Sequence, residues 1–161
     1  MKKLVQVVCI ATVALWLLPI TANAEGLTQQ DYIEIQQLYA RYNHAIDSGD
    51  AEGWADTFTA DGVFAGRFKG RDALIGFVKL WRERMNGAQR RHWNSNLTIA
   101  GDGKTATGSV YLMLLDIGQK PVAVASTGTY ADALVKTANG WRFTSRVVNN
   151  DPSPAAPPPA K

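Results

Sequence analysis

The sequence predicts an α+β domain in which a curved antiparallel sheet wraps, as a cone, around an N-terminal helical hairpin and a third helix. Two observations predict it. Apolar residues recur at helical spacing through the first half of the chain, and from Arg90 onward they recur every second residue. Gly- and Pro-containing turns then divide this second half into four segments of strand character. Strands this long in a small domain must curl, which leaves a cavity between sheet and helices.

The first helix is predicted from a single apolar stripe with a period near 3.6. Thr28 with Asp31 resembles a capping box, and Gly49 stands where a left-handed C-terminal cap is expected. The stripe comprises Tyr32, Ile35, Leu38, Tyr39, Tyr42, Ala45 and Ile46.

A short second helix is expected over Ala51–Phe58. Asp50 can cap it, and Trp54, Ala55 and Phe58 would pack back against the first helix. Ala60-Asp61-Gly62 then reads as a turn, followed by a strand over Val63–Phe68. The two helices therefore form a hairpin that leads into the sheet.

A third helix is predicted over Asp72–Met85, with Leu74, Phe77, Val78 and Trp81 on its apolar side. Four long strands follow, and we expect them to form an antiparallel meander that bends at Gly108 and Gly128. Their predicted ranges are Arg90–Ala100, Thr105–Asp116, Val122–Thr137 and Trp141–Asn150.

The ends of the 161-residue chain predict processing and export. Lys2 and Lys3 precede an apolar run that Pro19 interrupts, and Ala22-Asn23-Ala24 resembles a cleavage site, so residues 1–24 are predicted to be a signal peptide rather than a membrane anchor. The mature protein would then be periplasmic or secreted. Its domain would span residues 25–150, and the Pro- and Ala-rich residues 151–161 are predicted to be a disordered tail.

Charge and cysteine content narrow the function. The sole cysteine, Cys9, falls in the predicted signal, so thiol chemistry and disulfides are not expected after cleavage. Removing Lys2 and Lys3 leaves 15 basic against 14 acidic residues, a net charge of +1. We therefore expect no nucleic-acid partner and, after cleavage, no membrane association.

Polar residues interrupt the apolar pattern of the predicted helices and strands at three places. Asp47 lies in the last helical turn, where the helix dipole disfavours a carboxylate. His92, Asn94 and Asn96 share one side of the first long strand, which indicates a polar pocket there. In the last strand, Arg146 has the parity opposite to the expected core residues Trp141, Phe143 and Val147.

Several motifs resemble the SnoaL-like branch of the nuclear transport factor 2-like superfamily. They are A-I-D-S-G-D at the end of the first helix, G-R-D-A-L at Gly70–Leu74, R-H-W-N-S-N at Arg91–Asn96, T-G-T-Y-A-D-A-L-V-K, and G-W-R-F-T-S-R-V-V. The resemblance covers nearly all of Leu27–Asn150. Within this branch, the chain resembles the group that contains scytalone dehydratase, the bile-acid 7α-dehydratases and hexachlorocyclohexane dehydrochlorinase. The chain departs from scytalone dehydratase in having Ile46 beside Asp47 and no second pocket histidine.

The resemblance implies four catalytic residues: Asp47, His92, Tyr42 and Arg146. Asp47 would orient His92 as the base, Tyr42 would donate to a leaving hydroxyl or an enolate oxygen, and Arg146 would hold an anionic or carbonyl group. We expect Asn96, Trp54 and Phe58 to contact the substrate. With only His44 as a second histidine, no metal is expected, and no cofactor is required.

The expected activity is a lyase or isomerase that performs dehydratase-like elimination on a small cyclic or hydroxylated apolar molecule. Two alternatives stay open: a non-catalytic small-molecule-binding or oligomerisation domain, and a polyketide- or steroid-type cyclase or isomerase with Asp47 as base. A short His92–Asp47 hydrogen bond opening onto an enclosed cavity would favour the lyase, and an interior filled with Trp and Phe side chains would favour the binding domain. The apolar parity of the strands also predicts a homodimer or homotrimer.

Overall fold

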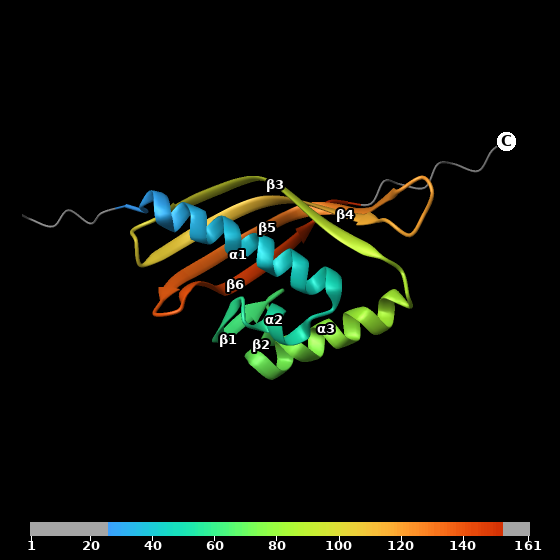
Figure 1. The fold of residues 1–161 in the computed structure, drawn as a ribbon, viewed down its shortest axis with the longest axis horizontal. Helices are drawn as coiled ribbons and strands as arrows, with labels where there is room; N and C mark the ends of the chain where they lie inside the picture. Colours follow the sequence, from blue (N-terminus) through green and yellow to red (C-terminus); the bar gives the residue numbers. More distant parts are fainter. Residues whose placement is uncertain (1–25, 153–161) are drawn as a thin grey trace, which may run out of the picture.

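A computed structural model describes residues 26–152, in which three helices lie on one side of a curved sheet (Figure 1). The predicted signal peptide and nearly all of the predicted tail lie outside these residues. The helices are α1 (Gln29–Ser48), α2 (Ala51–Ala55) and α3 (Arg71–Met85). The strands are β1 (Phe58–Phe64), β2 (Phe68–Lys69), β3 (Arg90–Gly101), β4 (Thr105–Asp116), β5 (Ala123–Thr137) and β6 (Gly140–Asn150).

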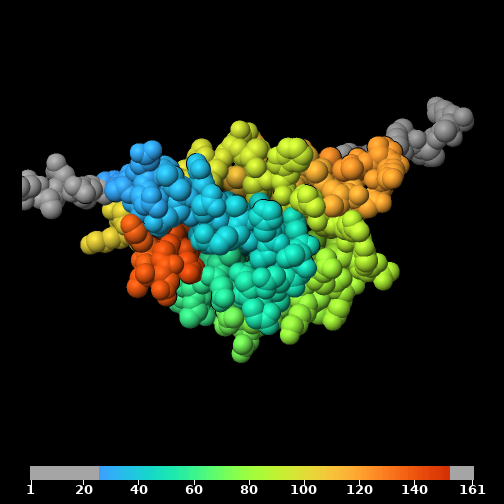
Figure 2. Space-filling view, in the orientation of Figure 1, coloured from blue at the N-terminus to red at the C-terminus, as the bar shows by residue number. Residues whose placement is uncertain are grey.

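The α+β architecture predicted from the sequence is confirmed. The six strands are ordered β2-β1-β6-β5-β4-β3, and β3 to β6 form the antiparallel meander expected from the turn signals. The prediction of a purely antiparallel sheet is wrong in one respect, because β1 pairs in parallel with β6 and makes the sheet mixed. In space-filling view, the helices and the neighbouring strands form one continuous surface (Figure 2).

The segment between α1 and α3 differs from its prediction. Helix α2 ends at Ala55, so Phe58 opens β1 instead of closing a helix. The expected turn around Gly62 is an irregularity within β1, where the register with β6 shifts between Phe58 and Val63. The chain reverses later, at Ala65 and Gly66, whose φ angles of 51° and 69° suit a tight hairpin between β1 and β2.

Helix α1 has the predicted caps, and its first turn is also attached to the sheet. Thr28 and Asp31 form a reciprocal capping box, and Gly49 ends the helix with a φ of 78°. The buried Asp31 carboxylate accepts hydrogen bonds from Lys136 Nζ at 2.7 Å and Trp141 Nε1 at 2.9 Å. One side chain thus caps the helix and joins it to β5 and β6.

The register of the long strands shifts at positions other than the predicted glycines. Register shifts occur between Ser95 and Thr98, between Leu114 and Leu115, and between Ala133 and Leu134. Gly108 and Gly128 serve close packing instead. A Cβ would lie 2.2 Å from the Tyr39 hydroxyl at Gly108 and 2.3 Å from the Asn149 carbonyl oxygen at Gly128.

The bulge opposite Ala133 and Leu134 reverses the inward and outward sides of β6. Leu134 pairs with Phe143 and Ala133 with Ser145, so Thr144 is the extra residue. Beyond it, Arg146 points into the core and Val147 is 44% exposed, the reverse of the sequence prediction. A one-residue slip has this effect because strand side chains alternate between the two faces.

Arg146 forms a fully buried ion pair with Asp132 at the centre of the core. Its Nε and Nη2 donate to Asp132 Oδ1 and Oδ2 at 2.8 and 2.7 Å, and the Tyr39 hydroxyl also donates to Asp132. The Arg146 Cζ lies 4.1–4.7 Å from the ring centres of Tyr39, Tyr42, Tyr130 and Phe143. Burial opposes the charge, but Asp132 raises the pKa of Arg146, so the guanidinium stays protonated.

Replacing Asp132 by Asn should destabilise the domain by about 3–5 kcal/mol, because it leaves the buried Arg146 charge without its counter-ion. The measurement is urea unfolding followed by circular dichroism. The double variant Asp132→Leu with Arg146→Met should recover most of the loss, because it removes both charges. An Asp132→Asn variant as stable as the parent chain would contradict the assigned importance of the pair.

Acid should weaken the attachment of α1 to the sheet. The hydrogen bond from Lys136, with those from Thr28 and Trp141, holds the pKa of Asp31 well below its ordinary range. A carboxyl whose pKa is lower in the folded state stabilises the fold above its unfolded pKa of about 4, and this contribution is lost as pH falls through the folded pKa. The free energy of unfolding, measured in urea across acidic pH, should fall less steeply for Asp31→Asn than for the parent chain. The exposed control Asp151→Asn should follow the parent, and identical slopes for all three would contradict the role of Asp31.

Candidate functional site

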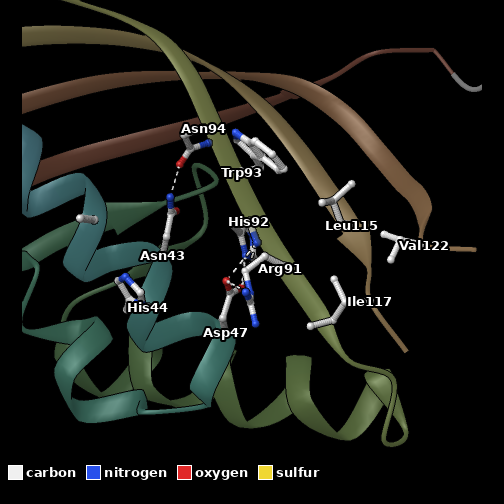
Figure 3. Close-up of a pocket in the computed structure, with 11 residues that line it drawn as sticks. Asn43, His44, Asp47, Arg91, His92, Trp93, Asn94, Leu115, Ile117 and Val122 are labelled. Atoms are coloured by element: carbon white, nitrogen blue, oxygen red, sulfur yellow. Dashed lines mark hydrogen bonds and ion pairs between the residues drawn. The ribbon is translucent and has the colours of Figure 1, made fainter. Parts of the chain in front are cut away.

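A partly open groove of about 610 Å³ lies where α1 meets the edge strand β3 (Figure 3). Its residues from α1 lie on one helix face, because they are spaced by three and one. The remaining walls come from β3 and from the hairpin between β4 and β5. The lining residues are Ala40, Asn43, His44, Asp47, Arg91, His92, Trp93, Asn94, Leu115, Ile117 and Val122.

Asp47 and His92 meet in this groove, as the sequence predicted (Figure 3). Asp47 Oδ1 lies 2.6 Å from His92 Nδ1, and the backbone N–H of His92 donates to Oδ2 at 3.0 Å. The two side chains are only 14% and 8% exposed, respectively. When the carboxylate is ionised and the imidazole is neutral, Nδ1 is the ring nitrogen that carries the proton, because a carboxylate can only accept, and Nε2 keeps its lone pair.

The surroundings of the pair offset the unfavourable position of Asp47 at the end of α1. The backbone and ring N–H groups of His92 both face the carboxylate, and Arg91 Nε lies 3.9 Å from Oδ2. On the other side, the Trp81 ring of α3 lies 5.9 Å from the His92 ring, measured between centroids. Three elements, α1, β3 and α3, therefore fix the orientation of the imidazole.

Beside this pair lies an amide pair, of which the sequence predicts Asn94 in the polar pocket but does not single out Asn43. Asn43 Nδ2 donates to Asn94 Oδ1 at 2.6 Å (Figure 3). Asn94 Nδ2 in turn donates to the Tyr111 carbonyl at 3.3 Å. Asn94 shares strand parity with His92, and Asn43 lies one helical turn before Asp47. These two spacings are the sequence features from which both residues could have been placed beside the Asp47–His92 pair.

The other predicted site residues lie away from the groove. Tyr42, Arg146, Trp54 and Phe58 are buried in the core, where Tyr42 packs against the other three and burial raises its pKa to about 12. Their assignment to the pocket is corrected for two reasons. The bulge in β6 turns Arg146 inward, and Tyr42 belongs to the same buried stripe as Leu38 and Tyr39.

Asn96 also departs from its predicted position on the pocket face. It is exposed and adopts a φ of 55° at the bulge of β3, between the paired residues Ser95 and Thr98. The bulge ends the alternation that places His92 and Asn94 on the groove side. Asn96 is therefore not among the residues that line the groove.

The two features that were expected to distinguish a lyase from a binding domain do not agree with each other. The His92–Asp47 hydrogen bond is short, but it borders a groove that is partly open instead of an enclosed cavity. The interior between helices and sheet is packed with aromatic rings, with Trp54 in contact with Tyr42, Phe58, Phe64 and Phe77. The groove, rather than the centre of the cone, is thus the candidate site.

Two further properties concern residues 26–152. Within this range, no group of three or more His, Cys, Asp or Glu side chains is arranged to hold a metal ion. Over the same range, none of the helices has the length and hydropathy needed to cross a membrane.

The fold and the groove define a small α+β domain with a helix-covered curved sheet and a polar pair at the sheet edge. The chain belongs to the SnoaL-like domain family, whose model matches residues 28–147. The resemblance inferred from the sequence motifs is thereby confirmed.

The chain is similar to proteins with different descriptions, including two sequence relatives and one solved structure. The uncharacterized protein Rv2910c of Mycobacterium tuberculosis is 30% identical over 122 residues, covering 73% of this chain and 83% of the relative. The anthranilate 1,2-dioxygenase small subunit of Burkholderia cepacia is 27% identical over 150 residues, covering 80% and 93%. A solved Catenulispora acidiphila structure in complex with S-DNPA is 34% identical with a TM-score of 0.67, covering 76% of this chain and 95% of that one.

Proposed function

We propose that this protein is a cofactor-free lyase or isomerase in which the Asp47–His92 pair abstracts a proton from a small molecule bound in the groove. The observation that carries the proposal is the 2.6 Å contact between Asp47 Oδ1 and His92 Nδ1, two groups 45 residues apart in the chain. Such a pair fixes the imidazole tautomer and stabilises the imidazolium that forms when Nε2 takes a proton.

The reaction that best suits the site is a dehydratase-like elimination. His92 Nε2 takes a proton from carbon, the electrons of that bond form a double bond, and hydroxide departs from the adjacent carbon. The departing oxygen needs a proton donor, and the imidazolium can return its proton there to release water. In an isomerisation, the same proton returns to a different carbon instead.

The groove lining supports a small cyclic or hydroxylated apolar substrate. Leu115, Ile117 and Val122 provide an apolar wall, and the Asn43–Asn94 pair provides amide groups beside the base. The Catenulispora acidiphila relative in complex with S-DNPA supports small-molecule binding in proteins of this kind.

The same site supports a cyclase or isomerase of the polyketide or steroid type, with Asp47 as the base. His92 would then only orient the carboxylate, through its ring and backbone N–H groups. The two mechanisms differ in which member of the pair accepts the proton from the substrate.

A second candidate function is non-catalytic binding or assembly. It is favoured by the interior filled with aromatic side chains and by similarity to the anthranilate 1,2-dioxygenase small subunit, whose name describes one subunit of an enzyme. In that case the groove would hold a ligand without converting it.

Replacing His92 by Ala should reduce turnover by about 10²–10⁴-fold while the domain stays folded, because it removes the base. Activity is measured on the small molecule that co-purifies with the protein, identified by mass spectrometry. Arg41→Ala, an exposed residue of α1 that does not line the groove, is the control and should retain activity. Full activity in His92→Ala with loss in Asp47→Asn would favour the cyclase or isomerase mechanism, and no turnover by the parent chain would favour the binding domain.

Export and self-association complete the proposal. The signal-like residues 1–24 support a periplasmic or secreted location.

The outer sheet face supports a homodimer or homotrimer, since Trp93 and Tyr111 are 62% and 57% exposed and Met113 pairs with Trp93 on the neighbouring strand. The exposed positions of β4 from Thr105 to Met113 carry no charge, which is typical of a self-associating surface.

Replacing Tyr111 by Glu should shift the protein towards monomer, because a carboxylate on this face would be desolvated on association. Multi-angle light scattering at micromolar concentration measures the change. The control Tyr32→Glu, on the exposed side of α1, should have the same oligomeric state as the parent chain. A monomeric parent chain would overturn the proposed assembly.

A further inference from the structure

A second cavity, of about 420 Å³, lies between α3 and the β1–β2 hairpin, apart from the groove described above. Its aromatic walls are Phe68 from the hairpin, with Phe77 and Trp81 from α3. The ring centroids of Phe68 and Phe77 are 4.8 Å apart. Leu80, on the same helix face, is 47% exposed, so the cavity presents apolar surface to the outside.

Two arginines stand beside these rings. Arg67 comes from the hairpin, with its Cζ 4.8 Å from the centre of the Phe68 ring, and Arg84 comes from the last turn of α3. Neither has an ion-pair partner within the described part of the chain, and no acidic residue lines the cavity. The cavity therefore has a net positive charge without an internal counter-ion.

Helix stability explains only part of this arrangement. A cation in the last turn of α3 complements the helix dipole, but Arg82 already occupies that turn. Arg67 lies outside any helix, and its guanidinium covers an aromatic ring of the cavity wall. The feature that unites Arg67 and Arg84 is the aromatic cavity between them.

We propose that this cavity binds a planar aromatic carboxylate, with its ring against Phe77 and Trp81 and its carboxylate between Arg67 and Arg84. The guanidinium fork matches the geometry of a carboxylate, and an aromatic wall favours a flat apolar body. The inference goes beyond the proposed catalytic function, because it concerns a different cavity and is tested by binding alone.

Trp81 gives this cavity a physical connection to the catalytic pair. Its ring lines the cavity and also lies 5.9 Å from the His92 ring. A ligand that packs against one side of Trp81 thus contacts the residue that supports the imidazole. The second cavity and the Asp47–His92 pair therefore share one neighbouring side chain, Trp81.

Calorimetric titration with cinnamate and its uncharged analogue cinnamamide tests the proposal on the intact protein. Cinnamate should bind at least about tenfold more tightly than cinnamamide, because charge-assisted hydrogen bonds to arginine are lost in the amide. Arg67→Ala and Arg84→Ala should each weaken cinnamate binding by about tenfold, and the preference for cinnamate should decrease at higher salt.

Arg41→Ala, an exposed arginine on α1, is the matched control and should bind cinnamate like the parent chain. Equal affinities for acid and amide, absence of binding, or unchanged affinity in both arginine variants would overturn the proposal. Tighter binding of phenyl phosphate than of cinnamate would overturn the carboxylate assignment. Since no turnover is measured, failure of the catalytic proposal leaves this test unaffected.

Discussion

The buried ion pair between Arg146 and Asp132 is the interaction on which the core of this domain depends. It joins β5 to β6, and the Tyr39 hydroxyl extends it to α1. Two buried charges are tolerated only when they are paired with each other, so the position of the pair constrains both strands and the helix above them. The close approach of Tyr39 to Gly108 on β4 follows from the same packing.

This arrangement separates structural from chemical roles among the polar residues. The residues expected to form an internal catalytic pocket, Tyr42 and Arg146, are used to fill and order the core. The Asp47–His92 pair lies further along α1, at the edge strand, where a ligand can reach it. The domain thus keeps a filled interior and places the Asp47–His92 pair at the margin of the sheet.

Helix α3 lies next to both the Asp47–His92 pair and the arginine-flanked cavity. One of its faces supports His92 through Trp81, and the same side chain lines the arginine-flanked cavity beside the β1–β2 hairpin. Helix α3 packs into the core mainly through Leu74 and Val78, and its last turns carry Trp81 and Arg84, which line the arginine-flanked cavity.

The sequence alone determined the properties that depend on local spacing. These are the caps of α1 and the extents of α3 and the four long strands. The pairing of Asp47 with His92, distant in the chain, was implied by the motif resemblance and not by spacing. The tertiary structure alone decided the parallel pairing of β1 with β6, the inward turn of Arg146 and the exposure of Asn96. Bulges explain the last two, because one extra residue reverses strand parity, and its position depends on contacts with residues distant in the chain.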